Sequence, residues 1–278
     1  MRTFIRRTLQ SFGYTVIRNS TFDNLVDSSR ALDNYRGRAA GYFGQVVERD
    51  LRNVKLHSIY PPDGEWFRRA HGALLGVEHD YIQVLINDLA QKGVKGDFAE
   101  FGIFEGAWVN LLYEMTERAG LGDRRVFGFD SFQGLSKPHT QFDTSYWKEG
   151  MYAAGRQQVE HNVKAHERPR VQLVEGFFNT SLNTPEAAAL GEVAFARIDC
   201  DIYEPAKECL EFLSKRLVHG SILVFDDWAH NFDVGEDRAF AEWVPTVPHL
   251  QFRFLFLGPW DHLHIRVLHR DKEDIFAS

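Results

Sequence analysis

Two clusters of acidic residues close two short apolar runs in the second half of the chain. The first run ends in Asp199 and Asp201, and the second ends in Asp226 and Asp227. Two carboxylates about 4 Å apart repel each other by roughly 4 kcal/mol at an effective dielectric constant near 20, so a gathered group needs a cation or shifted pKa values. Oxygen ligands favour a hard ion, Mg²⁺ or Ca²⁺. The alternative is that each aspartate caps a helix or is solvated in a loop.

The elements that must position these acids form a strand–helix–strand unit. Residues 193–198 and 221–225 are predicted strands, and Leu210, Leu213 and Leu217 share one face of a helix predicted at 205–217. The two strands of such a unit run parallel and are usually neighbours. Their acids should therefore meet at the carboxyl edge of the sheet, where ligands bind in open α/β sheets.

A turn with two glycines follows an earlier predicted strand, 97–102, and precedes a helix predicted at about 108–119. Its pattern is Glu100-x-Gly102-x-x-x-Gly106, and glycines at this position let a ligand approach the backbone closely. The turn lacks the Gly-x-Gly-x-x-Gly spacing of dinucleotide sites, and the chain has no Gly-Lys-Ser/Thr phosphate loop. A nucleotide-sugar dehydrogenase or reductase is therefore disfavoured.

Asp130 closes the next predicted strand, 125–129. An acid at this position, about 25 residues after the glycine turn, can accept hydrogen bonds from both hydroxyls of a ribose. The alternative is that Asp130 caps the turn that follows it. A glycine turn without a phosphate cradle, together with a ribose-binding acid, suits a nucleoside cofactor without phosphate, such as S-adenosylmethionine.

Apolar spacing predicts the remaining elements of an α/β fold. Helices are expected at 78–91, 151–165 and 238–244, and strands at 171–174, 251–257 and 262–269, the last two forming a hairpin. Strands that alternate with helices predict a seven-stranded, mostly parallel sheet with one antiparallel strand, a C-terminal antiparallel hairpin and helices on both faces. We expect one such domain over 71–278. Residues 1–70, which contain the turn 61–64, are predicted to be a helical extension that acts as a lid or an oligomer contact.

Composition limits the partners and the compartment. A net charge of −7 disfavours nucleic acid as a partner, because binding phosphates needs a basic face. The two cysteines, Cys200 and Cys209, suggest no disulfide framework and favour the cytoplasm. No apolar run is long enough to span a membrane. The basic, amphipathic first 18 residues lack the features of a signal peptide, and packing on the protein itself is favoured over contact with a membrane surface.

Five motifs carry a resemblance to a known family. They lie at 96–106, 129–135, 175–180, 198–205 and 224–227. In these motifs the chain resembles the macrocin O-methyltransferase family, the metal-dependent sugar methyltransferases of macrolide and aminocoumarin pathways, which have a seven-stranded class I methyltransferase fold. The resemblance implies binding of S-adenosylmethionine through seven residues: Glu100, Gly102, Gly106, Asp130, Ser131, Gly176 and Phe177.

The resemblance also implies the reacting groups. Asp199, Asp226 and Asp227 would hold Mg²⁺, and Asp201 would be the general base. The acceptor would be a sugar or glycoside hydroxyl with a vicinal oxygen, whose acidity a metal raises. Three features depart from the family pattern: Glu105 where a basic residue is frequent, Ala107-Trp108 where small residues are usual, and one extra residue in 180–182.

Several expectations remain open at this stage. His230 is a substitute base, and Tyr203 and Trp228 are candidate walls of the acceptor site. A catechol-type acceptor would use the same metal, and a non-catalytic interaction module built on this fold is a further alternative. A lysine or arginine that already neutralised the acids would remove the need for a metal ion.

Overall fold

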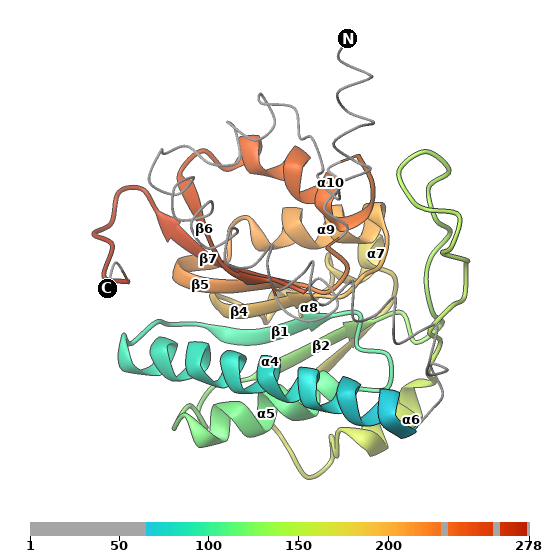
Figure 1. Cartoon of the computed structure of the whole chain (residues 1–278), viewed down its shortest axis with the longest axis horizontal. Helices are drawn as coiled ribbons and strands as arrows, with labels where there is room; N and C mark the ends of the chain where they lie inside the picture. Colours follow the sequence, from blue (N-terminus) through green and yellow to red (C-terminus); the bar gives the residue numbers. More distant parts are fainter. Residues whose placement is uncertain (1–64, 229–232, 258–261, 277–278) are drawn as a thin grey trace.

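The computed structural model describes residues 65–228, 233–257 and 262–276 (Figure 1). The predicted extension at 1–70 lies almost wholly outside these residues. Its expected boundary falls inside a long helix, α4 (Glu65–Gln91), which packs on the α/β domain. No helix of the described part is both long enough and apolar enough to cross a membrane.

A single seven-stranded sheet forms the centre of the described structure, with the strand order β3-β2-β1-β4-β5-β7-β6. Strands β1 to β5 run parallel, and β7 is antiparallel to both of its neighbours. The predicted seven strands, with one antiparallel strand and a C-terminal hairpin, are therefore confirmed. The strands are β1 (Asp97–Phe101), β2 (Val126–Asp130), β3 (Val171–Glu175), β4 (Val193–Ile198), β5 (Leu217–Phe225), β6 (Leu250–Leu257) and β7 (Leu263–His269).

The strand order creates a switch point between β1 and β4. The chain leaves β1 for β2 and β3 on one side, then returns to β4 on the other side, and ligands bind at such points in open α/β sheets. The register aligns the strand ends, since Phe101 pairs with both Phe129 and Ile198, and Ile198 pairs with Phe225. The turns that carry the predicted site residues therefore begin at the same level.

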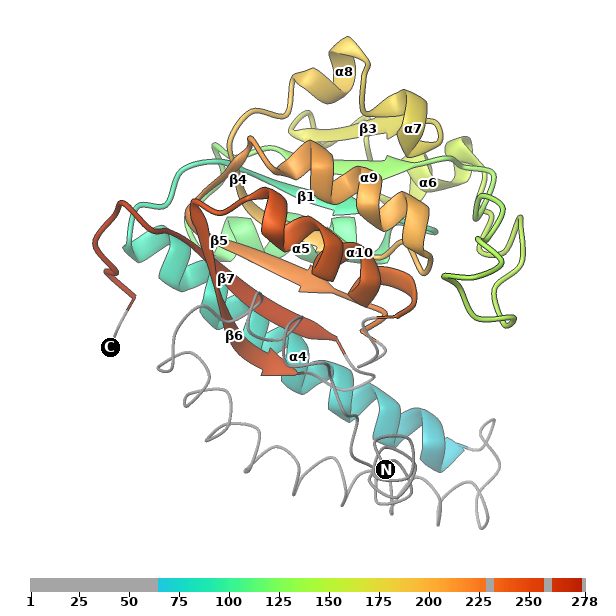
Figure 2. The ribbon, with the colours of Figure 1, turned by 90° about the horizontal axis from the view of Figure 1, so that it is seen from above.

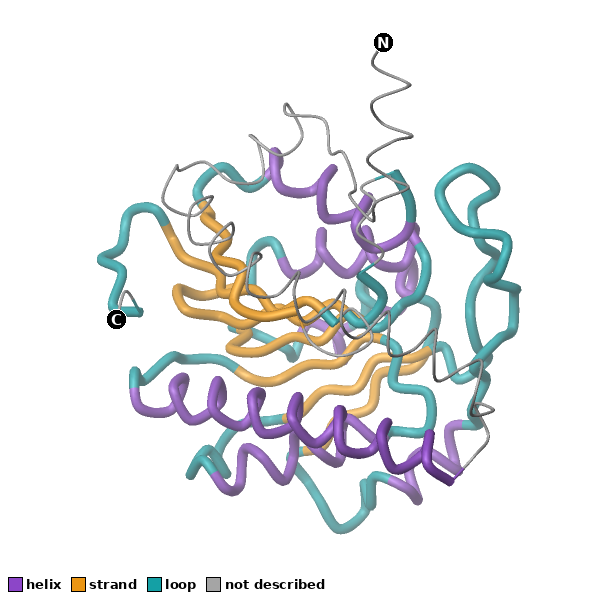
Figure 3. The backbone as a smooth tube through the Cα atoms, viewed as in Figure 1, coloured by secondary structure: helices purple, strands orange, loops and turns teal. Residues whose placement is uncertain are grey.

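Helices cover both faces of the sheet, as Figures 1 and 3 show. One face packs against α4, α5 (Ala107–Arg118) and α6 (Arg156–Asn162). The other packs against α7 (Phe178–Ser181), α8 (Pro185–Ala188), α9 (Tyr203–Leu213) and α10 (Gly235–Trp243), which ends in a 3₁₀ turn, Val244–Thr246. Because side chains alternate along a strand, Phe98 of β1 enters the first core while Ala99 and Phe101 enter the second.

Four helices have bounds that differ from the predicted ones, and the largest difference is in α4, which begins at Glu65 and not at residue 78. Helix α9 buries Ala206, Leu210 and Leu213 on the sheet but ends at Leu213, and Leu217 begins β5 instead of continuing the helix. Its spacing from Leu213 fits either element, so apolar periodicity did not place the boundary. Helix α6 is shorter than predicted, because 151–155 belong to a loop, and α10 begins three residues earlier than predicted.

Helix α4 runs alongside the β5, β7 and β6 side of the sheet (Figure 2). Two of its acids contact β7 or the residue before it: Glu78 lies 2.8 Å from His262 Nδ1, and Asp88 accepts a hydrogen bond from Arg266. Helix α4 is thus joined to the C-terminal hairpin by two polar contacts, of which that of Glu78 is buried and that of Asp88 is half-buried.

Candidate active site

A cavity of about 650 Å³ opens at the carboxyl ends of the parallel strands. This volume lies within the range of small-molecule sites. The turns after β1 to β5 form its floor, and the loop 134–152 forms a wall beside the sheet, visible at the right of Figure 1. The cavity therefore joins the predicted cofactor turn to the acidic clusters.

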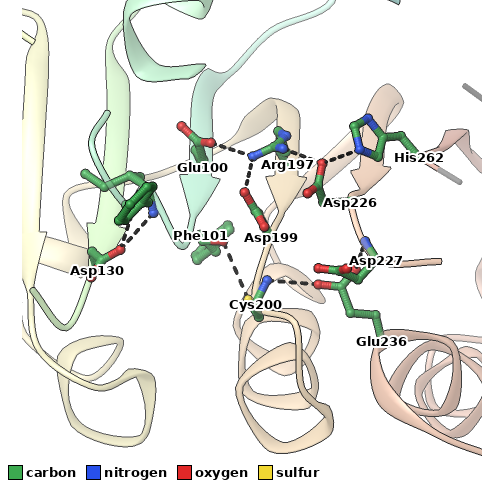
Figure 4. Close-up of polar contacts among 12 residues, drawn as sticks. Glu100, Phe101, Asp130, Arg197, Asp199, Cys200, Asp226, Asp227, Glu236 and His262 are labelled. Atoms are coloured by element: carbon green, nitrogen blue, oxygen red, sulfur yellow. Dashed lines mark hydrogen bonds and ion pairs between the residues drawn. The ribbon is translucent and has the colours of Figure 1, made fainter. Parts of the chain in front are cut away.

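The predicted metal ligands converge in this cavity. Asp199, Asp226 and Asp227 each offer a carboxylate oxygen, and these three atoms lie within 4.8 Å of one another (Figure 4). Opposite ligands of Mg²⁺ stand about 4.2 Å apart when each bond is about 2.1 Å. The trio fits a hard divalent ion after a small closure, and its all-oxygen donor set favours Mg²⁺ over zinc or copper.

A buried arginine, which the sequence reasoning had overlooked, pairs with two of these acids. Arg197 of β4 contacts Glu100 at 2.7 Å and also contacts Asp199 Oδ2 and Asp226 Oδ1. The Trp108 ring covers its guanidinium, with 4.5 Å between the guanidinium carbon and the ring centroid. A neutralising cation is therefore present, but its one positive charge is shared among three carboxylates, and it contacts only one oxygen of Asp199 and one of Asp226.

His262 lies between Asp226 and Glu78 and contacts both carboxylates. His262 Nε2 lies 2.9 Å from Asp226 Oδ1, and its Nδ1 lies 2.8 Å from the fully buried Glu78. Burial lowers the pKa of His262, but Asp226 and Glu78 together raise it to about 10. The ring is thus a cation at neutral pH. Carboxylates that bind a metal ion are commonly held in place by hydrogen bonds from outer residues, so His262 orients Asp226.

Burial and mutual repulsion separate the pKa values of the acids. Burial raises the pKa of Asp199 to about 8 and that of Asp227 to about 6. Burial acts on Asp226 in the same direction, but Arg197 and His262 hold its pKa below its usual value. Asp226 is therefore the permanent anion of the trio, and the charge of the other two depends on what binds beside them.

Asp201 lies beside Asp227, with which its side chain shares a hydrogen bond. Strand β4 ends at Ile198, and Asp201 has a left-handed backbone with a φ of 63°, so Asp201 is positioned by a turn and not by an extension of the strand beyond Asp199. Burial, then repulsion by Asp227, raises the pKa of Asp201 to about 9. At neutral pH the metal-free Asp201 therefore carries a proton, and it can act as the predicted base once a cation beside Asp227 offsets this repulsion and lowers its pKa.

A second overlooked residue, Glu236 of α10, joins the two acidic turns. Its Oε1 accepts the backbone N–H of Cys200 at 2.9 Å, and its Oε2 accepts that of Asp227 at 3.3 Å (Figure 4). The side chain is fully buried. Glu236 therefore fixes the turn after β4 relative to the turn after β5. The sequence signal for Arg197 is a charge inside the apolar run 193–198, whereas Glu236 precedes the helix predicted at 238–244 and no sequence signal marks it.

The predicted cofactor residues divide into two groups. Five of them line the cavity: Gly102, Asp130, Ser131, Gly176 and Phe177. Glu100 is buried behind the cavity wall, where it binds Arg197, and Gly106 packs against α6. A Cβ at Gly106 would lie 2.4 Å from Val163 Cγ1, so this glycine is required by helix packing.

The Asp130 carboxylate joins the turn after β1 to the turn after β2 by hydrogen bonds. Its Oδ2 accepts the backbone N–H of Ile103 at 2.9 Å and of Phe104 at 3.1 Å, and its Oδ1 accepts that of Phe132 at 2.7 Å. A carboxylate has about four acceptor positions, so Asp130 has room for about one further donor and not for both hydroxyls of a ribose as it stands. Asp130 therefore caps the turn that follows it, as the alternative predicted, and it also lines the cavity.

The cofactor end of the cavity fits a nucleoside. Gly102 and Gly176 present backbone without side chains on either side of the Asp130 turn, and Phe177 adds an aromatic wall. This combination of close backbone, one carboxylate acceptor and an apolar ring suits the adenosine part of S-adenosylmethionine. No cluster of basic side chains for a phosphate lies at this end of the described cavity.

Three other sequence predictions have different outcomes. Trp228 is buried against the rings of Phe225 and Phe240, and Tyr203 is buried with its hydroxyl donating to Glu242, so neither lines the cavity. Both proposed acceptor walls were therefore wrong, because these rings complete the core under α10. His230 lies outside the described residues.

Comparisons with known proteins agree with this architecture. The sequence model of the macrocin-O-methyltransferase (TylF) family matches residues 64–240. An 8-demethyl-8-(2,3-dimethoxy-alpha-L-rhamnosyl)-tetracenomycin-C 4'-O-methyltransferase of Streptomyces olivaceus is 28% identical over 176 residues, which cover 59% of this chain and 65% of that protein. A demethyldecarbamoylnovobiocin O-methyltransferase of Streptomyces niveus is 25% identical over 175 residues, covering 59% and 64%. The chain thus spans less than two thirds of each relative's length.

Solved structures show the same fold. The O-methyltransferase NovP superposes with a TM-score of 0.59 at 20% identity, over 69% of this chain and 80% of that one. The calicheamicin methyltransferase CalS11 superposes with a TM-score of 0.55 at 25% identity, over 81% and 93%. The fold is that of class I O-methyltransferases.

Proposed function

We propose that this chain, which belongs to the macrocin O-methyltransferase family, transfers the methyl group of S-adenosylmethionine to a hydroxyl of a sugar or glycosylated small molecule. The metal ion of this reaction would be Mg²⁺. The observation that carries the proposal is the convergence of three aspartate oxygens within 4.8 Å in the cavity that also contains the Gly102 and Asp130 turns. Family membership supplies the reaction class, and the acids supply the means to activate an alcohol.

Each residue of the site has a role in this reaction. Asp199, Asp226 and Asp227 would hold the metal ion, which supplies Lewis acidity and makes a nearby hydroxyl a better proton donor. Asp201 accepts the hydroxyl proton while the oxygen attacks the methyl carbon. The O–C bond forms as the S–C bond breaks, and S-adenosylhomocysteine leaves.

The buried charges behind the acids keep their geometry. Arg197 and His262 each contact an oxygen of a metal-binding carboxylate, which limits the rotation of Asp199 and Asp226. Glu236 fixes the backbone on which Asp227 is carried. Preorganised groups of this kind reduce the reorganisation that the reaction would otherwise require.

Methyl transfer to a rhamnoside, followed by mass spectrometry with Mg²⁺ and after exhaustive chelation, tests the proposal. We expect Asp199→Ala and Asp227→Ala to abolish metal-dependent turnover while S-adenosylhomocysteine still raises the melting temperature. Saturation at about 100 times the dissociation constant adds about 2.7 kcal/mol to stability. Asp201→Asn should bind both ligands and lose most of the rate. Asp271→Asn, at an exposed acid distant in sequence, is the control.

Two results would contradict this account. Full activity after chelation would remove the metal ion from the reaction, and wild-type turnover of Asp201→Asn would require another base. A sugar diol and a catechol both need only two neighbouring oxygens at the metal, so the site residues do not distinguish them. A catechol tested in parallel with the rhamnoside therefore separates the sugar reaction from the catechol-type alternative.

A further inference from the structure

The backbone at Asp201 is strained, so it needs support on both sides. Asp201 has a φ of 63°, a left-handed conformation that residues other than glycine rarely adopt. Such a conformation persists where the surrounding structure over-determines it. On the N-terminal side, the N–H of Cys200 donates a hydrogen bond to Glu236 at 2.9 Å. The group that holds the C-terminal side therefore also decides where the Asp201 carboxylate points.

Asp143 holds the C-terminal side of this turn from a distant part of the chain. Its Oδ1 accepts the backbone N–H of Tyr203 at 2.8 Å, across 60 positions of sequence. Tyr203 begins α9, and the N-cap position before it is occupied by Ile202, whose side chain cannot accept a hydrogen bond. Asp143 thus supplies the cap that the local sequence lacks, and its charge suits the positive end of the helix.

The Asp143 carboxylate is fixed within its own loop. Its Oδ2 accepts the backbone N–H of His139 at 2.6 Å, and the backbone N–H of Asp143 donates to the carbonyl of His139 at 3.0 Å. The neighbouring Phe142 carbonyl accepts the N–H of Gly235 at 2.7 Å, and the Arg238 guanidinium lies 3.6 Å from the Phe142 ring centroid. These contacts join the middle of the loop to the first turns of both α9 and α10.

Asp143 itself does not line the cavity. The loop contributes residues near its two ends to the lining, among them Leu135, Trp147 and Tyr152, whereas Asp143 lies outside it. The half-buried carboxylate of Asp143 is occupied by two backbone N–H groups. Any effect of Asp143 on the reaction must therefore pass through Tyr203 and the turn before it.

The three predicted metal ligands are held by other groups. The carboxylates of Asp199 and Asp226 contact Arg197. The backbone N–H of Asp227 donates to Glu236 at 3.3 Å. Loss of the loop carboxylate should thus displace the base and leave the metal site in place.

We infer that Asp143 is a positioning residue, which holds the Tyr203 N–H and thereby keeps the Asp201 carboxylate directed at the acceptor hydroxyl. A displacement of a reacting group by about 1 Å can reduce a rate about a hundredfold. The loop that walls the cavity and the turn that carries the base then form one unit, so the base is correctly placed only while the loop contacts α9. This inference rests on the proposed methyl transfer and adds a residue to it.

Steady-state kinetics of the full chain with a rhamnoside acceptor test the inference. Asp143→Ala should lower kcat at least tenfold. It should leave the KM for S-adenosylmethionine and the Mg²⁺-induced rise in melting temperature as they are in the parent. Asp143→Asn keeps one acceptor oxygen for the Tyr203 N–H, so its kcat should lie between those of the parent and the alanine variant.

Thr184→Ala is the matched control for the loss of a helix cap. Thr184 Oγ1 accepts the N–H of Ala187 at 3.2 Å and caps α8, outside the cavity lining. Loss of one cap should lower the melting temperature by about 2–4 °C in either variant, but only Asp143→Ala should lose kcat. Equal kcat values in the two variants would make Asp143 a stabilising cap alone and would overturn the inference.

A double substitution identifies the group through which Asp143 acts. In the Asp201→Asn background, Asp143→Ala should change the residual kcat, measured with a radiolabelled methyl donor, by less than twofold, because no base is left to misplace. A loss of at least tenfold in that background would show that Asp143 acts through the cavity wall and not through the base.

Hydrogen exchange separates the inference from the proposed reaction. In peptides that cover 200–204 of the full chain, Asp143→Ala should make the Tyr203 amide exchange at least tenfold faster, and Thr184→Ala should not change its rate. Unchanged exchange would overturn the inference even if the protein methylates rhamnosides. Faster exchange in the variant of a parent that transfers no methyl group would support the hold of Asp143 on the turn and refute the proposed reaction.

Discussion

Arg197→Met is expected to destabilise the protein, because it leaves the buried carboxylate of Glu100 without a cation. Arg197 is buried under Trp108 and contacts Glu100, Asp199 and Asp226. Without it, the fully enclosed Glu100 keeps no cation, and removing one partner of a buried ion pair costs about 3–5 kcal/mol. Loss of the cation–π contact with Trp108 adds about 0.5–1 kcal/mol.

Urea denaturation measures this loss. With a denaturant slope of about 3 kcal/mol per molar urea, the midpoint should fall by about 1.2–2 M. Arg118→Met is the matched control, since Arg118 forms a solvent-exposed pair with Glu114 at 3.2 Å, and such pairs contribute about 1 kcal/mol or less.

A second substitution identifies Glu100 as the cause. In the Arg197→Met background, Glu100→Gln removes the unpaired charge and should recover a substantial part of the lost stability. Glu100→Gln alone should destabilise the protein, because it weakens the hydrogen bond to Arg197. Opposite signs of one substitution in the two backgrounds are the signature of a coupled pair.

The pH profile gives an independent check. Burial, opposed by Arg197, raises the pKa of Glu100 well above its usual value. A raised pKa means that the folded state binds the proton more tightly than the unfolded chain does. The Arg197→Met variant should therefore be most stable at low pH and lose stability as the pH rises through the folded-state pKa. A variant within about 1 kcal/mol of the parent at every pH would refute the reasoning.

Three further predictions concern the turns and the metal ligands. Glu236→Ala should lower the free energy of unfolding by about 2–4 kcal/mol in urea denaturation, since the backbone N–H groups of Cys200 and Asp227 lose their acceptor. It should also reduce the Mg²⁺-induced rise in melting temperature. A neutral effect would contradict the positioning role of Glu236. Gly102→Ala should lower the free energy of unfolding by more than about 3 kcal/mol, because the new Cβ would lie 1.8 Å from the backbone oxygen of Asp199. Gly93→Ala, with open space around the new Cβ, should lower it by about 1–2 kcal/mol. Equal losses would show that backbone strain alone is responsible. Burial raises the pKa of Asp199 to about 8 and that of Asp227 to about 6, so the metal-free protein should lose stability as the pH rises through this range. Mg²⁺ should raise the melting temperature more at about pH 8.5 than at about pH 5.5, because it binds the ionised carboxylates. A rise in melting temperature that does not depend on pH would exclude these carboxylates as ligands.

The fold was predictable from the sequence because its signals are local. Apolar runs such as 193–198, bounded by turns and separated by helical periodicity, define strands and helices without reference to the rest of the chain. The handedness of strand–helix–strand units then brings the strand ends to one edge, so Asp199 and Asp226 could be expected to meet. Helix ends were less predictable, since Leu217 fits either element.

Only the tertiary structure decided what surrounds the acids. Arg197, Glu236 and the Glu78–His262 pair come from separate elements, and their contacts depend on how those elements pack. A sequence shows that a charge lies in a buried segment, but not which partner compensates it, because pairing is set by distances between residues far apart in the chain. Packing likewise placed Trp228 in the core, away from the cavity. Local motifs therefore determine which reacting groups the site contains, while the packing of the fold determines how their charges are balanced.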